Sequence, residues 1–338
     1  MKIIVLLGGE SAERRVSLLS GETVARALAD RGHEVYKVDL IDPVRIVPAH
    51  VALFREEVGE KPPKLSDLPR FTPRRLAALM ETLDRQRPDL VFPMLHGGMG
   101  EDGRLQAALE MVGLPFAGSG SLASALAMNK PVAKALFRTA GIPTPDDIVI
   151  PPGQAEANAV ADRIKKAFGF PAVLKPDALG STVGLSILQD ESGLDEALQA
   201  ITSMNYKVLI EPYIPGRELT VAMLGDQALP PVEIRPHSGL YDYHSKYTSG
   251  QTDYLCPAPL SDEETERLKA YGLAAHRVLG CRHYGRADFR VTDDGRPFCL
   301  EVNTIPGMTA HSLVPKAAAA LSISFEELVD RIANMAVE

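Results

Sequence analysis

Cysteines are few in this chain of 338 residues, and long apolar runs are lacking. The three cysteines, Cys256, Cys281 and Cys299, lack the spacing of metal ligands. A set that is odd in number and sparse favours reduced thiols in the cytosol over a disulfide framework. The apolar stretch at residues 3–7 is too short for a secretory signal and ends at two glycines. No later stretch of the sequence is both long and apolar enough to span a bilayer. We therefore expect a cytoplasmic protein with no membrane partner.

An excess of positive charge is also lacking. Lysine and arginine number 36 against 44 aspartates and glutamates, a net charge of −8, which argues against a nucleic-acid partner. It does not exclude a nucleotide, because one phosphate site needs only a few cations. The balance of 45% apolar and 24% charged residues is typical of a folded protein. The length exceeds one ordinary core, so two or three domains are expected.

The opening of the chain predicts a βαβ unit of a parallel sheet. Residues 3–7 predict a buried strand, a helix starts near Ser11 and ends at Gly32, and residues 35–38 predict the second strand. Residues 42–75 are rich in proline and charge and give no assignment. A strand at 90–93 and helices at 76–83 and 103–112 complete this α/β portion.

From Ala123 the pattern becomes α+β. Helices are predicted at 123–140 and 194–204, with strands at 172–174, 183–188 and 208–210. Antiparallel strands follow at 219–224, 286–291 and 298–302, a long polar and aromatic loop covers 241–254, and the last helix spans 325–335.

The last two strands carry the motif with the clearest chemistry. Asp294-Gly295 predicts a two-residue hairpin turn, and reflection about that turn places Asp288 opposite Glu301 and Arg286 opposite Asn303. The other face is expected to point to the core through Ala287, Phe289, Val291, Phe298, Leu300 and Val302.

Two carboxylates opposite each other repel and destabilise a sheet, and a bound hard cation would remove that repulsion. Carboxylate and amide oxygens suit magnesium. The alternative is a solvated strand face on which Arg286 and Arg290 neutralise the acids.

These residues carry a family resemblance. Arg286-Ala287-Asp288, followed by residues 300–315, closely resembles the C-terminal signature of the D-alanine–D-alanine ligases. Further family-like segments occur in family order: His96 to Gly103, Gly118-Ser119-Gly120, Met128-Asn129-Lys130, Leu209-Ile210-Glu211, Tyr241-Asp242-Tyr243 and Lys246-Tyr247. The resemblance covers nearly the whole chain.

The resemblance implies a three-domain ATP-grasp fold. Its expected parts are an N-terminal βαβ parallel-sheet domain at 1–118, a central subdomain at 119–213 and a C-terminal domain at 214–338. It implies that ATP lies between the last two and that two D-alanines are joined through a D-alanyl phosphate, for peptidoglycan precursors. It further implies ATP with two Mg²⁺ ions, for which Mn²⁺ can substitute, and a homodimer.

The resemblance also implies site residues, with Lys130 and Lys175 on the phosphates of ATP. Ser181 lies in the small-residue loop after Lys175, whose backbone N–H groups suit phosphates. Glu211 and Glu218 match contacts to the adenine amino group and the ribose. From the residues alone, Lys175 could be a surface lysine beside a hairpin turn and the glutamates merely solvated.

For the substrates, Glu13 matches the residue that binds the first D-alanine's ammonium, with Ser181 and Tyr247 as its hydrogen-bonding partners. His96 is expected near the first carboxylate and Lys246 near the second amine, and Ser312 and Leu313 match the second D-alanine site. The alternatives are an acid at a helix start for Glu13, a structural role for His96 and a helix N-cap for His311-Ser312.

Arg286 and the N–H of Gly307 are the expected stabilisers of the acyl phosphate and the oxyanion. Asp288, Glu301 and Asn303 are the expected metal ligands.

The sequence departs from many relatives at three places: Asn129, Thr182 and Ala178-Leu179. These changes bear on ATP affinity and remove neither a metal ligand nor Arg286. The competing interpretations are a D-alanine–D-lactate or D-alanine–D-serine ligase and a catalytically silent nucleotide-binding protein. Lys246-Tyr247 favours D-alanine as second substrate, because ester-forming relatives lack this pair.

Overall fold

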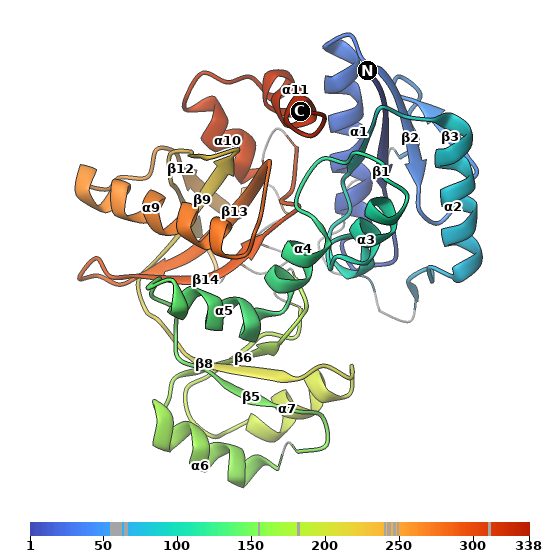
Figure 1. Ribbon diagram of the computed structural model, residues 1–338. Helices are drawn as coiled ribbons and strands as arrows, with labels where there is room; N and C mark the ends of the chain where they lie inside the picture. Colours follow the sequence, from blue (N-terminus) through green and yellow to red (C-terminus); the bar gives the residue numbers. More distant parts are fainter. Residues whose placement is uncertain are drawn as a thin grey trace.

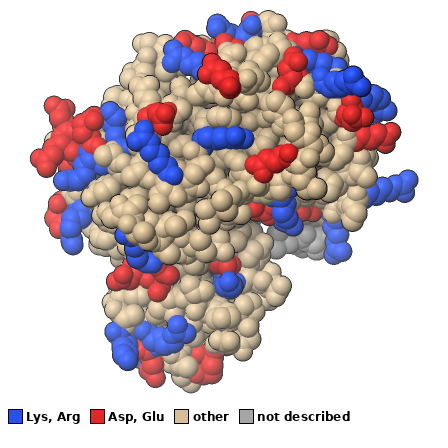
Figure 2. All heavy atoms as spheres, viewed as in Figure 1, with Lys and Arg blue, Asp and Glu red and all other residues tan. Residues whose placement is uncertain are grey.

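In the computed structural model, the described residues form three sheets that follow one another along the chain (Figure 1). It describes residues 1–54, 63, 67–154, 156–180, 183–239, 241, 245, 248, 250–309 and 312–338. None of the helices within these ranges is long and apolar enough to cross a membrane. On the face shown in Figure 2, basic and acidic side chains are interspersed.

The first sheet has the strand order β3-β2-β1-β4. Its parallel strands are β1 (Lys2–Leu7), β2 (Glu34–Asp39) and β4 (Leu90–Pro93), and β3 (Ile46–Pro48) runs antiparallel to β2. The helix α1 (Arg14–Asp30) connects β1 to β2, which confirms the predicted βαβ unit. The helices α2 (Pro73–Gln86) and α3 (Arg104–Met111) complete this part.

The second sheet is antiparallel, in the order β5-β8-β6-β7. Its strands are β5 (Ile148–Ile150), β6 (Ala172–Pro176), β7 (Ser186–Leu188) and β8 (Val208–Pro212). Helices α6 (Ala157–Ala167) and α7 (Leu194–Thr202) share one apolar core with it and lie on its lower face in Figure 1. The strand predicted at 183–188 is shorter in the structure, where β7 begins at Ser186.

The third sheet is also antiparallel and has the order β12-β11-β9-β13-β14, with β10 paired to β9. Its strands are β9 (Arg217–Leu224), β10 (Gln227–Ala228), β11 (Val232–Pro236), β12 (Thr252–Leu255), β13 (Tyr284–Val291) and β14 (Pro297–Asn303). The helix α9 (Asp262–Val278) covers it and begins at a capping box formed by Ser261 and Glu264.

The single helix predicted at Ala123–Ala140 is wrong. The structure has two helices, α4 (Ser121–Met128) and α5 (Lys130–Thr139), separated at Asn129. The Asn129 side chain accepts a hydrogen bond from the Val132 N–H (3.3 Å) and caps α5, whose first turn contains Pro131. Proline is tolerated in a first helical turn but not in a helix interior, so the break follows from the sequence. Both helices contribute to the apolar core of the third sheet.

The hairpin of β13 and β14 differs from the prediction near its turn and agrees with it at the site. Thr292 bonds to Arg296, so the turn has three residues, with Gly295 at a φ of +79°. A bulge at Leu300 then shifts the register by one residue, and Asp288 lies opposite Glu301 as predicted. The expectation that Phe298 and Leu300 face the core is wrong: Cys299 is buried there, and Leu300 lines a pocket.

The end of the described chain returns to its beginning. Helices α10 (Leu313–Ala319) and α11 (Phe325–Met335) follow the third sheet, and α11 lies beside α1 (Figure 1). The two helices share one apolar core through residues such as Leu28 and Ile332. Asp330 of α11 lies 3.2 Å from Arg31 and 2.8 Å from His33, which follow α1. The first and third sheets are thereby held together.

Candidate active site

Two pockets adjoin at the centre of the molecule. The first, of about 180 Å³, lies where loops of the first sheet meet the end of β14 and α10. The second, of about 160 Å³, lies between the second and third sheets. The residues that line both pockets are Lys130, Gly180, Tyr241, Arg286 and Glu301. A molecule in one pocket can therefore react with a molecule in the other at this shared wall.

The second pocket has apolar walls and a polar end. Its apolar residues come from both sheets and include Val173, Ile187, Ile234 and Leu300. The backbone from Glu211 to Ile214, where β8 ends, forms one edge. An apolar slot with backbone groups at its edge suits an adenine ring, and Lys130 and Lys175, which also line the pocket, suit phosphates.

Glu211 is nearly inaccessible, with 3% of its side chain exposed, and two lysines contact it. Lys175 lies 2.7 Å from one carboxylate oxygen, and Lys134 contacts the other. Burial alone would raise the pKa of Glu211, but the two lysines lower it. Burial likewise opposes the charge on Lys175, but Glu211 raises its pKa. Both groups are therefore charged, which corrects the view of Glu211 and Lys175 as solvated surface residues.

Glu218 and Arg290 line the same pocket. They lie 3.7 Å apart, and Arg290 also donates to the carbonyls of Ile214 (3.1 Å) and Gly216 (2.8 Å). Arg290 therefore holds the backbone that follows β8 at the edge of the pocket. The alternative in which it neutralises Asp288 and Glu301 finds no support among its contacts.

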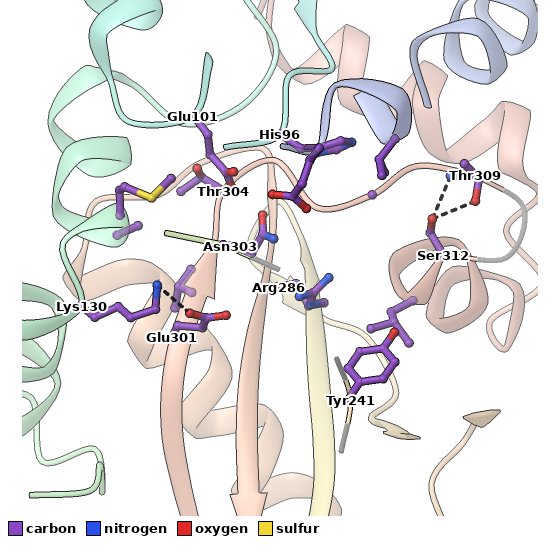
Figure 3. Close-up of a pocket in the computed structure, with 18 of the residues that line it drawn as sticks. His96, Glu101, Lys130, Tyr241, Arg286, Glu301, Asn303, Thr304, Thr309 and Ser312 are labelled. Atoms are coloured by element: carbon purple, nitrogen blue, oxygen red, sulfur yellow. Dashed lines mark hydrogen bonds and ion pairs between the residues drawn. The ribbon is translucent and has the colours of Figure 1, made fainter. Parts of the chain in front are cut away.

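Arg286 and Asp288 form a two-pronged ion pair on the polar face of β13. The guanidinium donates to both carboxylate oxygens, at 2.8 and 2.7 Å, and the Thr220 hydroxyl donates to the same carboxylate at 2.7 Å. Burial alone would lower the pKa of Arg286, but Asp288 raises it well above its usual range. Opposite, Lys130 lies 3.2 Å from Glu301 (Figure 3). The predicted pair of carboxylates is therefore partly neutralised by these two cations.

The oxygen atoms of Asp288, Glu301 and Asn303 are compatible with a hard cation. The two carboxylates are cross-strand neighbours, and Asn303 follows two residues after Glu301 on the same strand. Each lines at least one pocket, and about a third of the Glu301 side chain is exposed. A carboxylate has about four lone-pair sites, so the contacts with Arg286 and Lys130 leave room for a metal. Within the described ranges, no group of three or more His, Cys, Asp or Glu side chains forms another candidate.

The first pocket brings together most of the predicted substrate-binding and catalytic residues: Glu13, His96, Arg286, Gly307, Ser312 and Leu313. Glu13 immediately precedes α1, and Ser312 immediately precedes α10. The Ser312 side chain does not cap α10. Its hydroxyl lies 3.0 Å from both the backbone nitrogen and the hydroxyl of Thr309 (Figure 3). The Ser312 oxygen also lies close enough to Gly307 that an added Cβ there would meet it at 3.2 Å.

His96 and Glu101 hold the backbone of Ile305. The Nδ1 of His96 lies 2.8 Å from the Ile305 carbonyl oxygen, and its Nε2 lies 3.2 Å from the Ser20 hydroxyl. Glu101 accepts hydrogen bonds from the N–H groups of Gly97 (2.8 Å) and Ile305 (3.4 Å). Burial lowers the pKa of His96, so the ring is neutral. His96 therefore positions the backbone that leads to Gly307, which supports the structural alternative for this residue.

Glu101 was given no role on the sequence, although it lies in the segment that resembles the family. It is buried and lines the first pocket. Burial raises its pKa to about 7, and the nearby Glu13 contributes in the same direction. Tyr241 and Tyr254 were also missed. Their hydroxyls lie 3.1 Å apart at the first pocket, and the aromatic content of 241–254 was the available signal.

Ser181, Lys246 and Tyr247 lie outside the described residues. The predicted hydrogen bonds of Ser181 and Tyr247 to Glu13, and the place of Lys246 near the second amine, therefore stay predictions.

Known protein families and sequences match almost the whole chain. Residues 2–119 match the family described as D-ala D-ala ligase N-terminus, and residues 136–334 match D-ala D-ala ligase C-terminus. The D-alanine–D-alanine ligase of Synechococcus sp. (strain JA-3-3Ab) is 44% identical over 339 residues, covering 100% of this chain and 94% of its own. That of Geobacter sulfurreducens is 42% identical, covering 98% of this chain and 92% of its own.

Solved structures show the same fold. The D-alanine–D-alanine ligase of Bacillus anthracis in complex with ATP has a TM-score of 0.77 at 30% identity, covering 100% of this chain and 97% of its own. The VanG D-Ala:D-Ser ligase of Enterococcus faecalis has a TM-score of 0.76 at 27% identity, covering 99% and 98%. The predicted α/β ATP-grasp fold is confirmed. With both family regions matched and relatives similar along their whole length, the chain belongs to the D-alanine–D-alanine ligase family.

Proposed function

We propose that this chain joins two D-alanines to D-alanyl-D-alanine and converts one ATP to ADP and phosphate in doing so. The observation that carries the proposal is the wall shared by the two pockets, formed by Lys130, Arg286 and Glu301 with Gly180 and Tyr241. ATP in the second pocket would place its γ-phosphate at this wall, and D-alanine in the first pocket would meet it there.

The reaction proceeds in two steps. The carboxylate of the first D-alanine attacks the γ-phosphorus, the bond to ADP breaks, and a D-alanyl phosphate forms. The neutral amine of the second D-alanine then attacks the acyl carbon, and phosphate leaves as the amine loses its proton. Positioning and fixed positive charge supply most of the catalysis in such transfers.

The remaining roles follow the family resemblance, and those of Ser181, Lys246 and Tyr247 rest on that resemblance alone. Lys130 and Lys175 hold phosphate oxygens, Glu211 and Glu218 face the adenosine, and Ser181 contributes to the loop over the phosphates. Arg286 and the N–H of Gly307 stabilise the acyl phosphate and the oxyanion. Glu13 receives the first ammonium with Tyr247 and Ser181 beside it, Lys246 lies near the second amine, and Ser312 with Leu313 receives the second D-alanine.

Asp288, Glu301 and Asn303 are the residues that would hold two Mg²⁺ ions, with Mn²⁺ as a substitute. When bound, such ions neutralise phosphate charge and orient the γ-phosphate. We place the enzyme in the cytoplasm, where ATP is available, and expect a homodimer. The product would serve peptidoglycan precursor synthesis.

A D-alanine–D-serine ligase is the second candidate function. The observation that favours it is the similarity to the VanG D-Ala:D-Ser ligase, whose TM-score of 0.76 is close to the 0.77 of the Bacillus anthracis enzyme. The overall fold therefore does not separate the two substrates. The Lys246-Tyr247 pair favours D-alanine over D-lactate.

The test is ATP-dependent release of phosphate with D-alanine, L-alanine, D-serine or D-lactate offered as second substrate beside D-alanine. We expect release with D-alanine alone to exceed that of every mixed pair, with the dipeptide as product. A larger rate with D-serine, or a mixed dipeptide as the main product, would select the second candidate. Phosphate release in none of the reactions would reject ligase activity.

A further inference from the structure

Lys134 is a fully buried lysine that lines neither pocket. It lies on α5 one turn after Lys130, and its ammonium contacts Glu211 and lies 3.7 Å from Asp147. Burying an ammonium group costs free energy unless an anion is buried beside it. The partner that it contacts most closely, Glu211, lies on the second sheet, whereas α5 contributes to the core of the third.

Lys134 belongs to a cluster of five charged side chains. Arg138 pairs with Asp147 and also donates to the carbonyl of Pro145, at 3.0 Å, on the wall of the second pocket. Glu211 pairs with Lys134 through one oxygen and with Lys175 through the other. Three cations and two anions leave one net positive charge. Of the five members, Lys175 and Glu211 line the pocket.

Removal of Lys134 would change this balance at the point where the cluster meets the pocket. Lys175 and Glu211 would then form a neutral pair 2.7 Å apart, with no net attraction for a phosphate. With Lys134 present, Glu211 is already balanced, and the net charge is available at Lys175.

We infer that Lys134 is a positioning residue for the nucleotide: it holds and neutralises Glu211, and so lets Lys175 act on the phosphates. The inference rests on the proposed function, because it takes ATP as the occupant of the second pocket. It deepens that function by assigning a task to a side chain that does not touch the nucleotide.

The test compares the affinities of the purified full chain for ATP, ADP and adenosine by calorimetry or competition. The Lys134→Met variant keeps the length of the side chain and removes its charge. We expect roughly ten- to a hundred-fold weaker binding of ATP and ADP, the range for loss of one charged hydrogen bond, and a smaller loss for adenosine, which has no phosphate. Lys165→Met is the matched control, because Lys165 is an exposed lysine on α6 that pairs with Glu191. It should bind all three as the unchanged protein does.

The double variant Lys134→Met with Glu211→Gln tests the charge balance directly. It again leaves one net positive charge at Lys175, so the ratio of ATP to adenosine affinity should return to that of the unchanged protein. Because both partners of the buried pair are replaced, this variant also serves if Lys134→Met alone does not fold. If the ratio of ATP to adenosine affinity in the double variant stayed roughly ten-fold or more below that of the unchanged protein, as in Lys134→Met, the inference would be overturned.

The same measurements separate the inference from the proposed function. Failure of the unchanged protein to bind ATP would contradict the proposed function itself. Normal ATP binding by the unchanged protein together with normal binding by Lys134→Met would overturn the inference and leave the function standing.

Discussion

The Lys130 ammonium lies 3.2 Å from the Glu301 carboxylate (Figure 3) and also donates to the carbonyl of Leu179 at 2.7 Å. One side chain of α5 thus connects β14 with the loop that follows β6. Lys130 and Glu301 line both pockets, so a change in either should affect the transfer step more than the binding of one substrate.

Glu301→Gln should nearly abolish turnover while the fold stays intact. The substitution removes a proposed metal ligand and also relieves the repulsion between Glu301 and Asp288 in the metal-free protein. The measurement is phosphate release across a magnesium titration, with thermal unfolding as the check on folding. Asp294→Asn, at the exposed turn of the same hairpin, is the control and should behave normally. Normal turnover of Glu301→Gln at limiting magnesium would reject the metal assignment.

Arg286→Lys should lower kcat by roughly 10²–10³-fold, because a lysine cannot hold Asp288 in a two-pronged pair and still face the reacting oxygens. The KM for ATP should change much less. Steady-state kinetics of this variant and of Arg296→Lys, an exposed arginine near the turn, provide the comparison. Equal losses in both variants would indicate a general effect on the hairpin, and a normal kcat in Arg286→Lys would remove its catalytic role.

Glu101 should make stability depend on pH. Its pKa is about 7 in the fold against the usual 4.5, so the fold favours the protonated side chain. The resulting stabilisation is fully present below pH 4.5 and is lost as the pH rises to 7, a change of about 3 kcal/mol. Urea unfolding of the unchanged protein and of Glu101→Gln at several pH values measures the difference. A difference that stays constant from pH 4.5 to 8 would contradict this prediction.

Asp330→Asn should lower the free energy of unfolding by about 1–2 kcal/mol at pH 7, the scale of a partly buried charged hydrogen bond, with kcat unchanged. Burial alone would raise the pKa of Asp330, but bonds from His33 and Arg31 lower it. Its stabilisation is therefore present above the usual pKa of 3.8 and is lost as the pH falls through the lowered value. Asp226→Asn, in an exposed pair with Arg277, is the control. Equal stability of the two variants would show that the contact between α11 and α1 does not need this charge.

The hairpin shows how far the sequence alone could lead. Cross-strand placement of Asp288 and Glu301 was predicted from an assumed two-residue turn, and it is correct although the turn has three residues. The bulge at Leu300 compensates for the extra residue. Alternation of apolar and polar residues does not reveal a bulge, because Leu300 suits an apolar pocket wall as well as a core.

The charges buried between elements were beyond the reach of sequence reasoning. Motif positions identified Lys130, Lys175 and Glu211, but not the contact of Glu211 with Lys134, which joins residues 77 positions apart. Glu101 was likewise visible as part of a motif, while its raised pKa depends on burial beside Glu13. Such properties come from tertiary packing, which one sequence does not display.

The packing of α11 against α1 has a consequence for folding during translation. A ribosome produces the first sheet early, but Val24 and Leu28 share their core with Leu328 and Ile332. The growing chain must therefore carry an uncovered apolar helix face until residues 325–335 have been made. We expect nascent chains that stop before α11 to attract chaperones, and the first pocket to become competent only late in translation.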